Sequence, residues 1–348
     1  AVRTGDGTGH ALRSFGGNAG YHRQSHIYPD DPPWRGFEPI RRRVIGMRRL
    51  VPYGWLLFIG ISWGATQPLS KIAVSSGYQP LGLIFWQMSI SAVVLGLVNM
   101  IRRRPLPINR RVLPFYLAIA LIGTIIPNAA SYKAYTVLPA GIMALLLSLI
   151  PMIAFPIALM FGLDRFSFKR MAGLSLGLFA VLLIIGVPEA LPDAAMLAFI
   201  PLGLLPSLMY AFEGNFVARF GTGGAGPLQL LLGASIIGTA VSGPLAYSSG
   251  QWINPLHVWG IADVAVVTSA LIHSVVYTLY VMIVRQFGPV FSVQVSYVVT
   301  AAGLGWAMLI LGERYAGPIW LALVLMFMGI YLVSPNLKDS QNGKPHSK

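Results

Sequence analysis

The sequence contains no cysteine, so disulfide bonds, thiolate nucleophiles and cysteine-ligated metal sites are excluded. Charge is also scarce: charged residues make up 10% of the 348 residues, whereas an ordinary soluble domain carries about 25%. The chain is instead 55% hydrophobic, with a mean hydropathy of +0.67. Its apolar runs recur at about the length of a bilayer crossing, roughly 20 residues. This composition predicts an all-α protein that crosses a membrane many times.

Motifs for ATP use and for catalysis are missing as well. The sequence has no phosphate-binding G-x-x-x-x-G-K-[ST] loop, so ATP is not expected to drive the protein directly. No H-E-x-x-H motif, nucleophile elbow or clustered carboxylate pair lies in an apolar run. We therefore expect no enzyme activity, no cofactor and no metal. A secondary transporter of a small-molecule solute is favoured over two alternatives, an intramembrane enzyme acting on lipid-linked substrates and a channel.

Ten membrane spans are predicted from the apolar runs, with short connections that are rich in proline and glycine. The predicted spans are Tyr53–Ser75, Leu81–Ile101, Val112–Val137, Ala140–Gly162, Arg170–Val187, Ala195–Phe220, Leu228–Ser248, Val258–Phe287, Pro289–Leu311 and Pro318–Val333.

The distribution of basic residues predicts the orientation. If the N-terminus is cytoplasmic, 22 of the 25 Lys and Arg residues fall on the cytoplasmic side, and only Lys71, Lys133 and Arg314 do not. This bias favours cytoplasmic N- and C-termini and an even number of spans. It also accounts for the net charge of +14 without a nucleic-acid partner, because anionic lipid headgroups would supply the counterions.

The two ends of the chain are predicted to lie outside the membrane domain. Residues 1–46 are polar and rich in glycine and arginine, with too few apolar residues to offset the entropy of ordering, so a disordered basic tail is expected. Met47 is an alternative start, which would make this tail non-native; a genuine cytoplasmic tail is the other interpretation. Residues 334–348 are predicted to form a cytoplasmic C-terminal tail.

The spans divide into two similar halves, residues 53–187 and 195–333, with five predicted spans in each. Landmarks recur at nearly one offset: Trp63 and Tyr210, Pro80 and Pro227, Asp164 and Glu313. Because five is odd, the second half would enter the membrane from the opposite face. Inverted repeats of this kind enclose, in many transporters, a midplane site that is exposed alternately to each side.

Several of these residues resemble the EamA-type transporters of the drug/metabolite transporter superfamily, over about residues 50–335. The resemblance rests on the Trp63-Gly64 opening with Lys71, on Gly312-Glu313-Arg314 followed by Ala322 and Gly329, and on the helix with Pro151. It implies two inverted five-helix repeats around a central cavity. It also implies alternating-access transport, often export, of a small metabolite or amphipathic compound across the bacterial inner membrane, by a monomer or homodimer.

Amide and aromatic side chains within the spans are the candidate solute contacts, because such groups among apolar walls suit a small, partly apolar solute. The candidate substrate-binding residues are Trp63, Gln67, Lys71, Trp86, Gln87, Asn128, Tyr132, His273, Gln294 and Tyr297. Other interpretations stay open: interfacial packing for Trp86 and Tyr132, hydrogen bonding between helices for the amides, and a hydrogen-bonded core histidine for His273. Lys71, near a span end, can also reach the interface with its long side chain.

Glu213 is the candidate proton-coupling residue. It is the sole carboxylate of the sixth predicted span, and carboxylates inside spans are costly and usually functional. Arg219 does not share its helix face, so it is not a partner on the same helix. The alternative is that Glu213 reaches the inner headgroups.

Three prolines inside spans are candidate hinges: Pro68, Pro151 and Pro156. Each removes a helical hydrogen bond and can bend its helix. The alternative is that they are simply tolerated, as proline often is in membrane helices. Asp263, near a span end, is expected to be hydrated.

Overall fold

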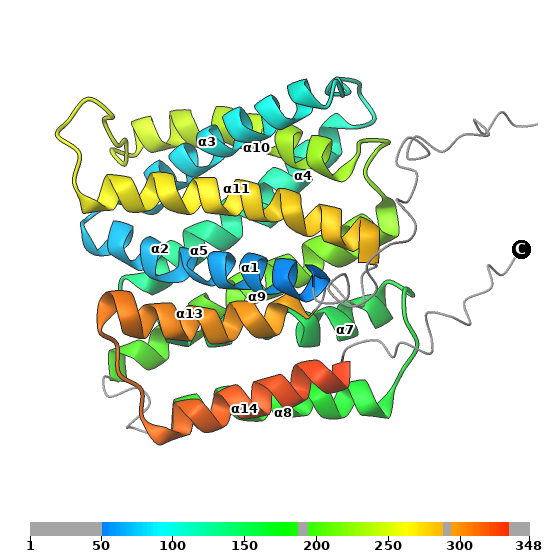
Figure 1. Ribbon diagram of the computed structural model, residues 1–348, viewed down its shortest axis with the longest axis vertical. Helices are drawn as coiled ribbons and strands as arrows, with labels where there is room; N and C mark the ends of the chain where they lie inside the picture. The colour runs from blue at the N-terminus through cyan, green and yellow to red at the C-terminus, as the bar shows by residue number, and fades with distance from the viewer. Residues whose placement is uncertain (1–50, 187–193, 288–293, 334–348) are drawn as a thin grey trace, which may run out of the picture. The chain divides into compact units, whose positions relative to one another are not determined.

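The computed structural model describes residues 51–186, 194–287 and 294–333, and within these residues every regular element is a helix (Figure 1). Helices occupy each range in which a span is predicted, as far as those ranges are described. Seven helical segments of the described chain are long and apolar enough to cross a membrane. Two more, Val295–Leu311 and Gly317–Val333, are apolar but shorter. The predicted tails, residues 1–46 and 334–348, lie outside the described residues.

The first predicted span is interrupted. Helix α1, Val51–Gly64, ends one residue before α2, Thr66–Ser75, begins. Pro68 has no N–H group to donate to the carbonyl of Gly64, four residues earlier, so the helical ladder is broken at this point. The break at Ala65 lies inside the predicted span Tyr53–Ser75, three residues before the candidate hinge Pro68.

The third and fourth predicted spans are interrupted as well. Helices α4 (Leu113–Ala120) and α5 (Ile126–Tyr135) are joined by a π-helical turn, η2 (Leu121–Ile125), just before Pro127. Helices α6 (Ala140–Leu147) and α7 (Ile150–Met160) are separated just before Pro151. Pro156 lies inside α7, which continues through it. Pro68, Pro127 and Pro151 therefore lie next to interruptions of the helix, whereas Pro156 does not.

Prolines at helix starts have the opposite effect. Helix α3, Pro80–Ile101, and helix α10, Pro227–Ser248, both begin with proline in the first turn, where the missing N–H costs nothing and the fixed φ favours a helix. The two helices pack side by side (Figure 1), with the Met88 side chain against Gly238.

The remaining helices are α8 (Phe168–Gly186), α9 (Ala194–Phe220), α11 (Ile261–Phe287), α13 (Val295–Leu311) and α14 (Gly317–Val333). The predicted start at Val258 was wrong, because α11 begins only at Ile261 and Val258 is 94% exposed in the preceding loop. The Asp263 carboxylate accepts the Gly260 N–H at 2.8 Å, which satisfies one of the free donors at the helix start.

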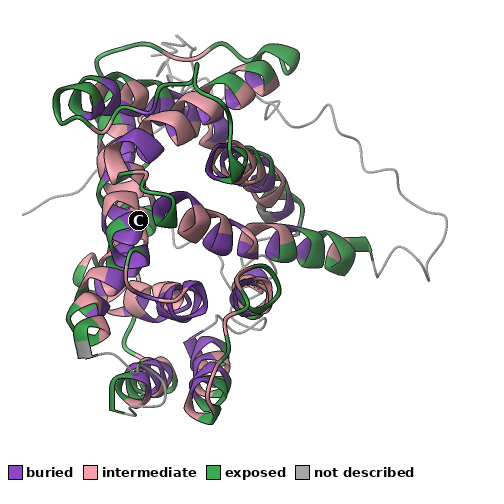
Figure 2. Cartoon of the chain, turned by 90° about the vertical axis from the view of Figure 1, so that its left-hand side faces the viewer, coloured by how far each residue is buried: buried purple, intermediate pink, exposed green. Residues whose placement is uncertain are grey.

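Close helix contacts use glycine. Helices α8 and α14 lie against each other, and a side-chain carbon added at Gly173 would come within 2.6 Å of the Gly329 carbonyl oxygen. Helix α6 is the most enclosed element, since every residue from Ala140 to Leu146 is buried. Buried residues face other helices, while exposed ones lie on the outer helix faces (Figure 2). The exposed residues include large apolar ones, such as Ile101, Phe168 and Leu309, as expected where lipid is the solvent.

When the helices of the two halves are matched in chain order, a contact between two helices recurs between their counterparts in the other half. Helix α1 packs on α13 and α9 on α7; α2 packs on α11 and α5 on α9; α3 packs on α11 and α4 on α10. Helices α3 and α10, α8 and α14, and α6 and α13 each pair an element with its counterpart. Exchanging the halves therefore reproduces these contacts.

The helices place their connections at two ends. One, which we call the Glu313 end, carries the connections 76–79, 136–139, 249–260 and 312–316. The other, the arginine end, carries the connections 102–112, 161–167 and 221–226, with exposed Arg102, Arg103, Arg104, Arg110 and Arg111.

Candidate functional site

Four polar side chains from both halves of the chain form a hydrogen-bonded network between the helices. Asn128 on α5 donates to the Gln87 carbonyl oxygen at 3.1 Å, and the Tyr132 hydroxyl donates to the same oxygen at 2.6 Å. Tyr210 on α9 donates to the Asn128 carbonyl oxygen at 2.9 Å. We call Gln87, Asn128, Tyr132 and Tyr210 the amide–tyrosine network.

A second pair of predicted residues lies beside this network. Gln67 on α2 is buried and accepts a hydrogen bond from the Tyr135 hydroxyl. Lys71, one turn further along α2, donates its ammonium group to the carbonyls of Tyr135, at 2.5 Å, and Leu138, at 3.0 Å. Lys71 thus completes the C-terminal end of α5, where cations and donors are favoured.

Glu313 holds the other side of the same connection. Its carboxylate accepts the backbone N–H groups of Ala140, at 2.8 Å, and Gly141, at 3.1 Å, which are free donors at the start of α6. The Tyr315 hydroxyl donates to the same carboxylate. Burial, and then this hydrogen bond, raise the pKa of Tyr315 well above its ordinary value. Residues 136–139 are therefore fixed by a cation at the end of one helix and an anion at the start of the next.

A small pocket opens next to Gln87 and Tyr132. It lies between α2, α3, α5 and α11, and is lined by Leu69, Ser70, Ala73, Leu83, Gln87, Tyr132, Ala265, Val266, Ser269 and Ala270. Its lining is apolar apart from Ser70, Gln87, Tyr132 and Ser269.

Glu213 faces the π-helical turn. A side-chain carbon added at Gly123 would come within 2.5 Å of one carboxylate oxygen of Glu213, so the acid lies directly against the Gly123 backbone. Pro127 cannot donate to the Gly123 carbonyl, which favours the π-turn at this place. Tyr210 and Tyr277 lie within electrostatic range of the Glu213 charge. Glu213 forms none of the ion pairs or hydrogen bonds found among the described residues.

An aromatic cluster lies between helices α1 and α11. The Trp63 ring meets His273, Tyr277 and Tyr280 of α11 edge-on, with ring centroids 5.8, 6.5 and 5.8 Å away. His273 and Tyr277 are stacked at 6.4 Å. Two of the predicted substrate contacts, Trp63 and His273, are therefore neighbours, although they come from different halves of the chain.

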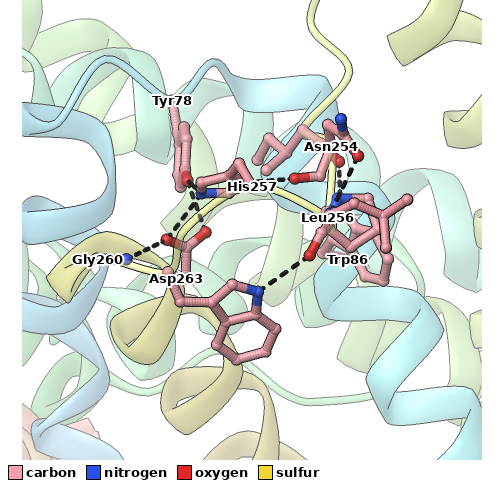
Figure 3. Close-up of polar contacts among 10 residues, drawn as sticks. Tyr78, Trp86, Asn254, Leu256, His257, Gly260 and Asp263 are labelled. Atoms are coloured by element: carbon pink, nitrogen blue, oxygen red, sulfur yellow. Dashed lines mark hydrogen bonds and ion pairs between the residues drawn. The ribbon is translucent and has the colours of Figure 1, made fainter.

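Three predicted substrate contacts lie apart from the amide–tyrosine network. The Trp86 indole donates to the Ile253 carbonyl at 3.1 Å (Figure 3) and packs on Phe85 and Trp252 at the Glu313 end. Gln294 stands at the start of α13, and Tyr297 packs on Phe327 of α14. Helix α13 packs against α1, α2, α6 and α14, whereas the network lies on α3, α5 and α9.

A polar cluster at the Glu313 end was not expected from the sequence (Figure 3). Tyr78 donates to Asp263 at 2.6 Å, and the His257 ring lies 3.1 Å from both the Tyr78 hydroxyl and the Asp263 carboxylate. Asp263 is buried, so the expectation of a hydrated carboxylate was wrong. A hydrogen bond to the Asn254 carbonyl, and then Asp263, raise the pKa of the His257 imidazole. Burial and the bond to Asp263 raise the pKa of Tyr78 to about 12.

Tyr210, Tyr277 and Gly123, which lie near Glu213, were not among the candidate residues predicted from the sequence. Tyr210 had a readable signal, because it lies three residues before Glu213 and so shares its helix face. Gly123 had none, because only the three-dimensional structure brings it to α9. Among the described residues, no group of three His, Asp or Glu side chains could hold a metal ion.

Comparison with known proteins gives the fold and the family. No curated protein matches the chain. A solved structure titled "Crystal structure of protein" matches with a TM-score of 0.56 and 16% identity, over 80% of this chain and 96% of the other, which bears on the fold alone. The sequence model of the EamA-like transporter family matches twice, at residues 51–186 and 197–334. These two matches cover most of the chain, and the protein belongs to the EamA-like transporter family.

Proposed function

We propose that this membrane protein is a secondary transporter that carries a small solute across the bacterial inner membrane by alternating access, in the direction of export. Membership of a transporter family supports the general class. The observation that carries the proposal is the placement of the amide–tyrosine network, with Gln87, Asn128 and Tyr132 from the first half and Tyr210 from the second. A solute held by this network would contact both halves, so a movement of one half against the other would change the side from which it is reached.

The proposed topology has ten crossings, as two inverted repeats of five, with both termini in the cytoplasm. The exchange pattern of helix packing supports two equivalent halves. The arginine end supports the orientation, because its exposed arginines are expected on the cytoplasmic side. The Glu313 end would then face away from the cytoplasm.

Pro68 and Pro151 are proposed as the hinges of this movement. Both stand at places where the helix is already interrupted, so bending there breaks few further hydrogen bonds. Pro156 is the weaker hinge of the three, since α7 continues through it.

Glu213 is proposed to take up a proton in one stage of the cycle and to release it in another. The Glu213 residue is half-buried, and Tyr210 of the amide–tyrosine network lies three residues before it on the same helix face. When the surrounding helices close, desolvation favours proton uptake, and opening toward water favours release. A carboxylate that holds no fixed cationic partner is free to change its charge.

Flux in proteoliposomes tests the transporter against the alternatives. Vesicles are loaded with a metabolite mixture, and mass spectrometry identifies the compounds that leave. Saturable flux with counterflow supports a carrier, non-saturable flux supports a channel, and chemical conversion supports an enzyme. Glu213→Gln should abolish flux driven by a pH gradient and retain exchange. Asp164→Asn is the control, because Asp164 lies away from the site in an ion pair with Arg170.

A further inference from the structure

Glu213 lies at the candidate site without an ion-pair partner among the described residues. The ion pairs found in the described residues join Arg170 to Asp164 and His257 to Asp263, and neither includes Glu213. Lys71 is the cation of helix α2. Its ammonium group donates hydrogen bonds to the carbonyls of Tyr135 and Leu138. Among the described residues, a negative charge at Glu213 therefore has no positive side chain as its partner, and a charge held in this way is costly until one is supplied.

The Glu213 carboxylate packs closely against the backbone of the π-helical turn. On one side lies Gly123, where even a single added carbon would approach a carboxylate oxygen to 2.5 Å. The Glu213 residue is half-buried, and its carboxylate lies among the helices rather than at the protein surface. Its polar neighbours are hydroxyls, from Tyr210 on the same helix and Tyr277 on α11.

Aromatic rings continue from this point. Tyr277, which feels the charge of Glu213, stacks on His273 and lies 6.5 Å from Trp63 between ring centroids. Aromatic faces attract cations, most strongly where water is excluded, and tryptophan and tyrosine are the strongest of them. The same rings provide apolar contact area for a solute body.

We propose that the transported solute is an organic cation, an ammonium group on an apolar or aromatic body, with its charge at Glu213 and its body against Trp63 and Tyr277. This inference rests on the proposed transport function and names its substrate class. An anion would meet an uncompensated carboxylate, and a neutral solute would displace water from it without replacing the lost interaction. A cation replaces that interaction, because it forms an ion pair with the Glu213 carboxylate.

Three probes with one phenyl group and different charge test this proposal: (2-phenylethyl)trimethylammonium, 3-phenyl-1-propanol and 3-phenylpropionate. Binding to the purified full chain in a nonionic detergent is measured by isothermal titration calorimetry. The cation should bind about tenfold or more tightly than the alcohol, since Coulomb attraction to the carboxylate and cation–π contact with the rings together exceed the free energy of a tenfold difference. The anion should bind most weakly.

The variants attribute the preference to one carboxylate. Glu213→Gln should reduce the affinity for the cation to that for the alcohol, Glu213→Asp should retain the preference, and Asp164→Asn should bind all three probes like the unchanged chain. Folding is checked by the unchanged affinity of each variant for the neutral alcohol.

Three results would overturn the inference: equal affinities for the three probes, no binding of the cation at millimolar concentration, or an unchanged preference in Glu213→Gln. Flux measurements distinguish a wrong substrate class from a wrong transport function. If only neutral or anionic compounds show saturable flux, the protein is a transporter but its substrate is not an organic cation. If the cation binds at Glu213 but no compound shows flux, the cation site is supported and the proposed transport function is wrong.

Discussion

Removing the carboxylate of Glu313 should destabilise the fold far more than removing its counterpart in the first half, Asp164. Glu313 accepts two backbone N–H groups, from Ala140 and Gly141, at the start of a helix whose first seven residues are all buried. Glu313→Ala leaves both donors without a partner. A hydrogen bond to a charged group contributes about 1.5–3 kcal/mol, and the two bonds share one carboxylate, so we expect a loss of about 3 kcal/mol.

Asp164 provides the matched control. It occupies the position that corresponds to Glu313, but it pairs with the Arg170 side chain, and its own side chain is 34% exposed. Exposed ion pairs contribute about 0–1 kcal/mol, so Asp164→Ala should change little. Tyr315→Phe, which removes one hydroxyl from the carboxylate of Glu313, should fall between them, at about 1 kcal/mol.

Thermal unfolding of the purified variants in one detergent measures the difference. A loss of about 3 kcal/mol should lower Tm by about 5 °C or more, and Asp164→Ala should lie within about 1 °C of the unchanged chain. Equal shifts for Glu313→Ala and Asp164→Ala would refute the reasoning, because they would mean that capping α6 contributes nothing beyond an exposed pair.

Further predictions concern the polar cluster, the π-turn and the topology. The raised pKa of His257 means that its protonated form stabilises the folded state; this contribution is complete below about pH 6.5, the ordinary histidine pKa, and is lost as pH rises through the raised value. Tm should therefore fall across that range, and His257→Gln should remove this part of the pH dependence; an identical Tm profile for both proteins would contradict it. Gly123→Ala should displace the Glu213 carboxylate and reduce proton-driven flux, whereas Gly305→Ala, at a glycine with no neighbour within 4 Å, should not. Equal flux in the two variants would show that the close approach is unimportant. Reporter proteins fused at Lys348 and within residues 188–193 should be found on opposite sides of the membrane, with Lys348 cytoplasmic; signals from one side would exclude the inverted repeats.

Much of the helix pattern could be predicted from the sequence, because apolar runs end where proline, glycine or charge begins. Helices α3 and α10 start at Pro80 and Pro227, within one residue of prediction. The interruptions were harder to place. A proline removes one hydrogen bond wherever it stands, but Pro156 stays inside a continuous helix while Pro68 and Pro151 follow breaks. The surrounding packing decides which outcome holds.

The candidate site was predictable in its residue types and not in its contacts. Gln87, Asn128 and Tyr132 were expected as solute contacts, and the structure joins them by hydrogen bonds. The bond from Tyr210, on the other half of the chain, to Asn128 could not be predicted from the sequence. Lys71 was expected to contact solute or reach the interface, and no signal in the sequence indicated that it donates to carbonyls 64 and 67 residues away. Asp263 is buried for the same reason: Tyr78, distant in sequence, covers it.

The most direct test of alternating access uses the absence of cysteine from the natural sequence. Ser269 lines the pocket beside Gln87 and Tyr132, so Ser269→Cys places one reactive thiol at the candidate site. A membrane-impermeant maleimide is applied to right-side-out and to inside-out vesicles, with Ser249→Cys at the Glu313 end and Arg104→Cys at the arginine end as controls for one face each. We expect Ser269→Cys to react from both faces. Each control should react from one face only, and the two controls from opposite faces. Reaction of Ser269→Cys from a single face under every condition of pH and solute would contradict alternating access.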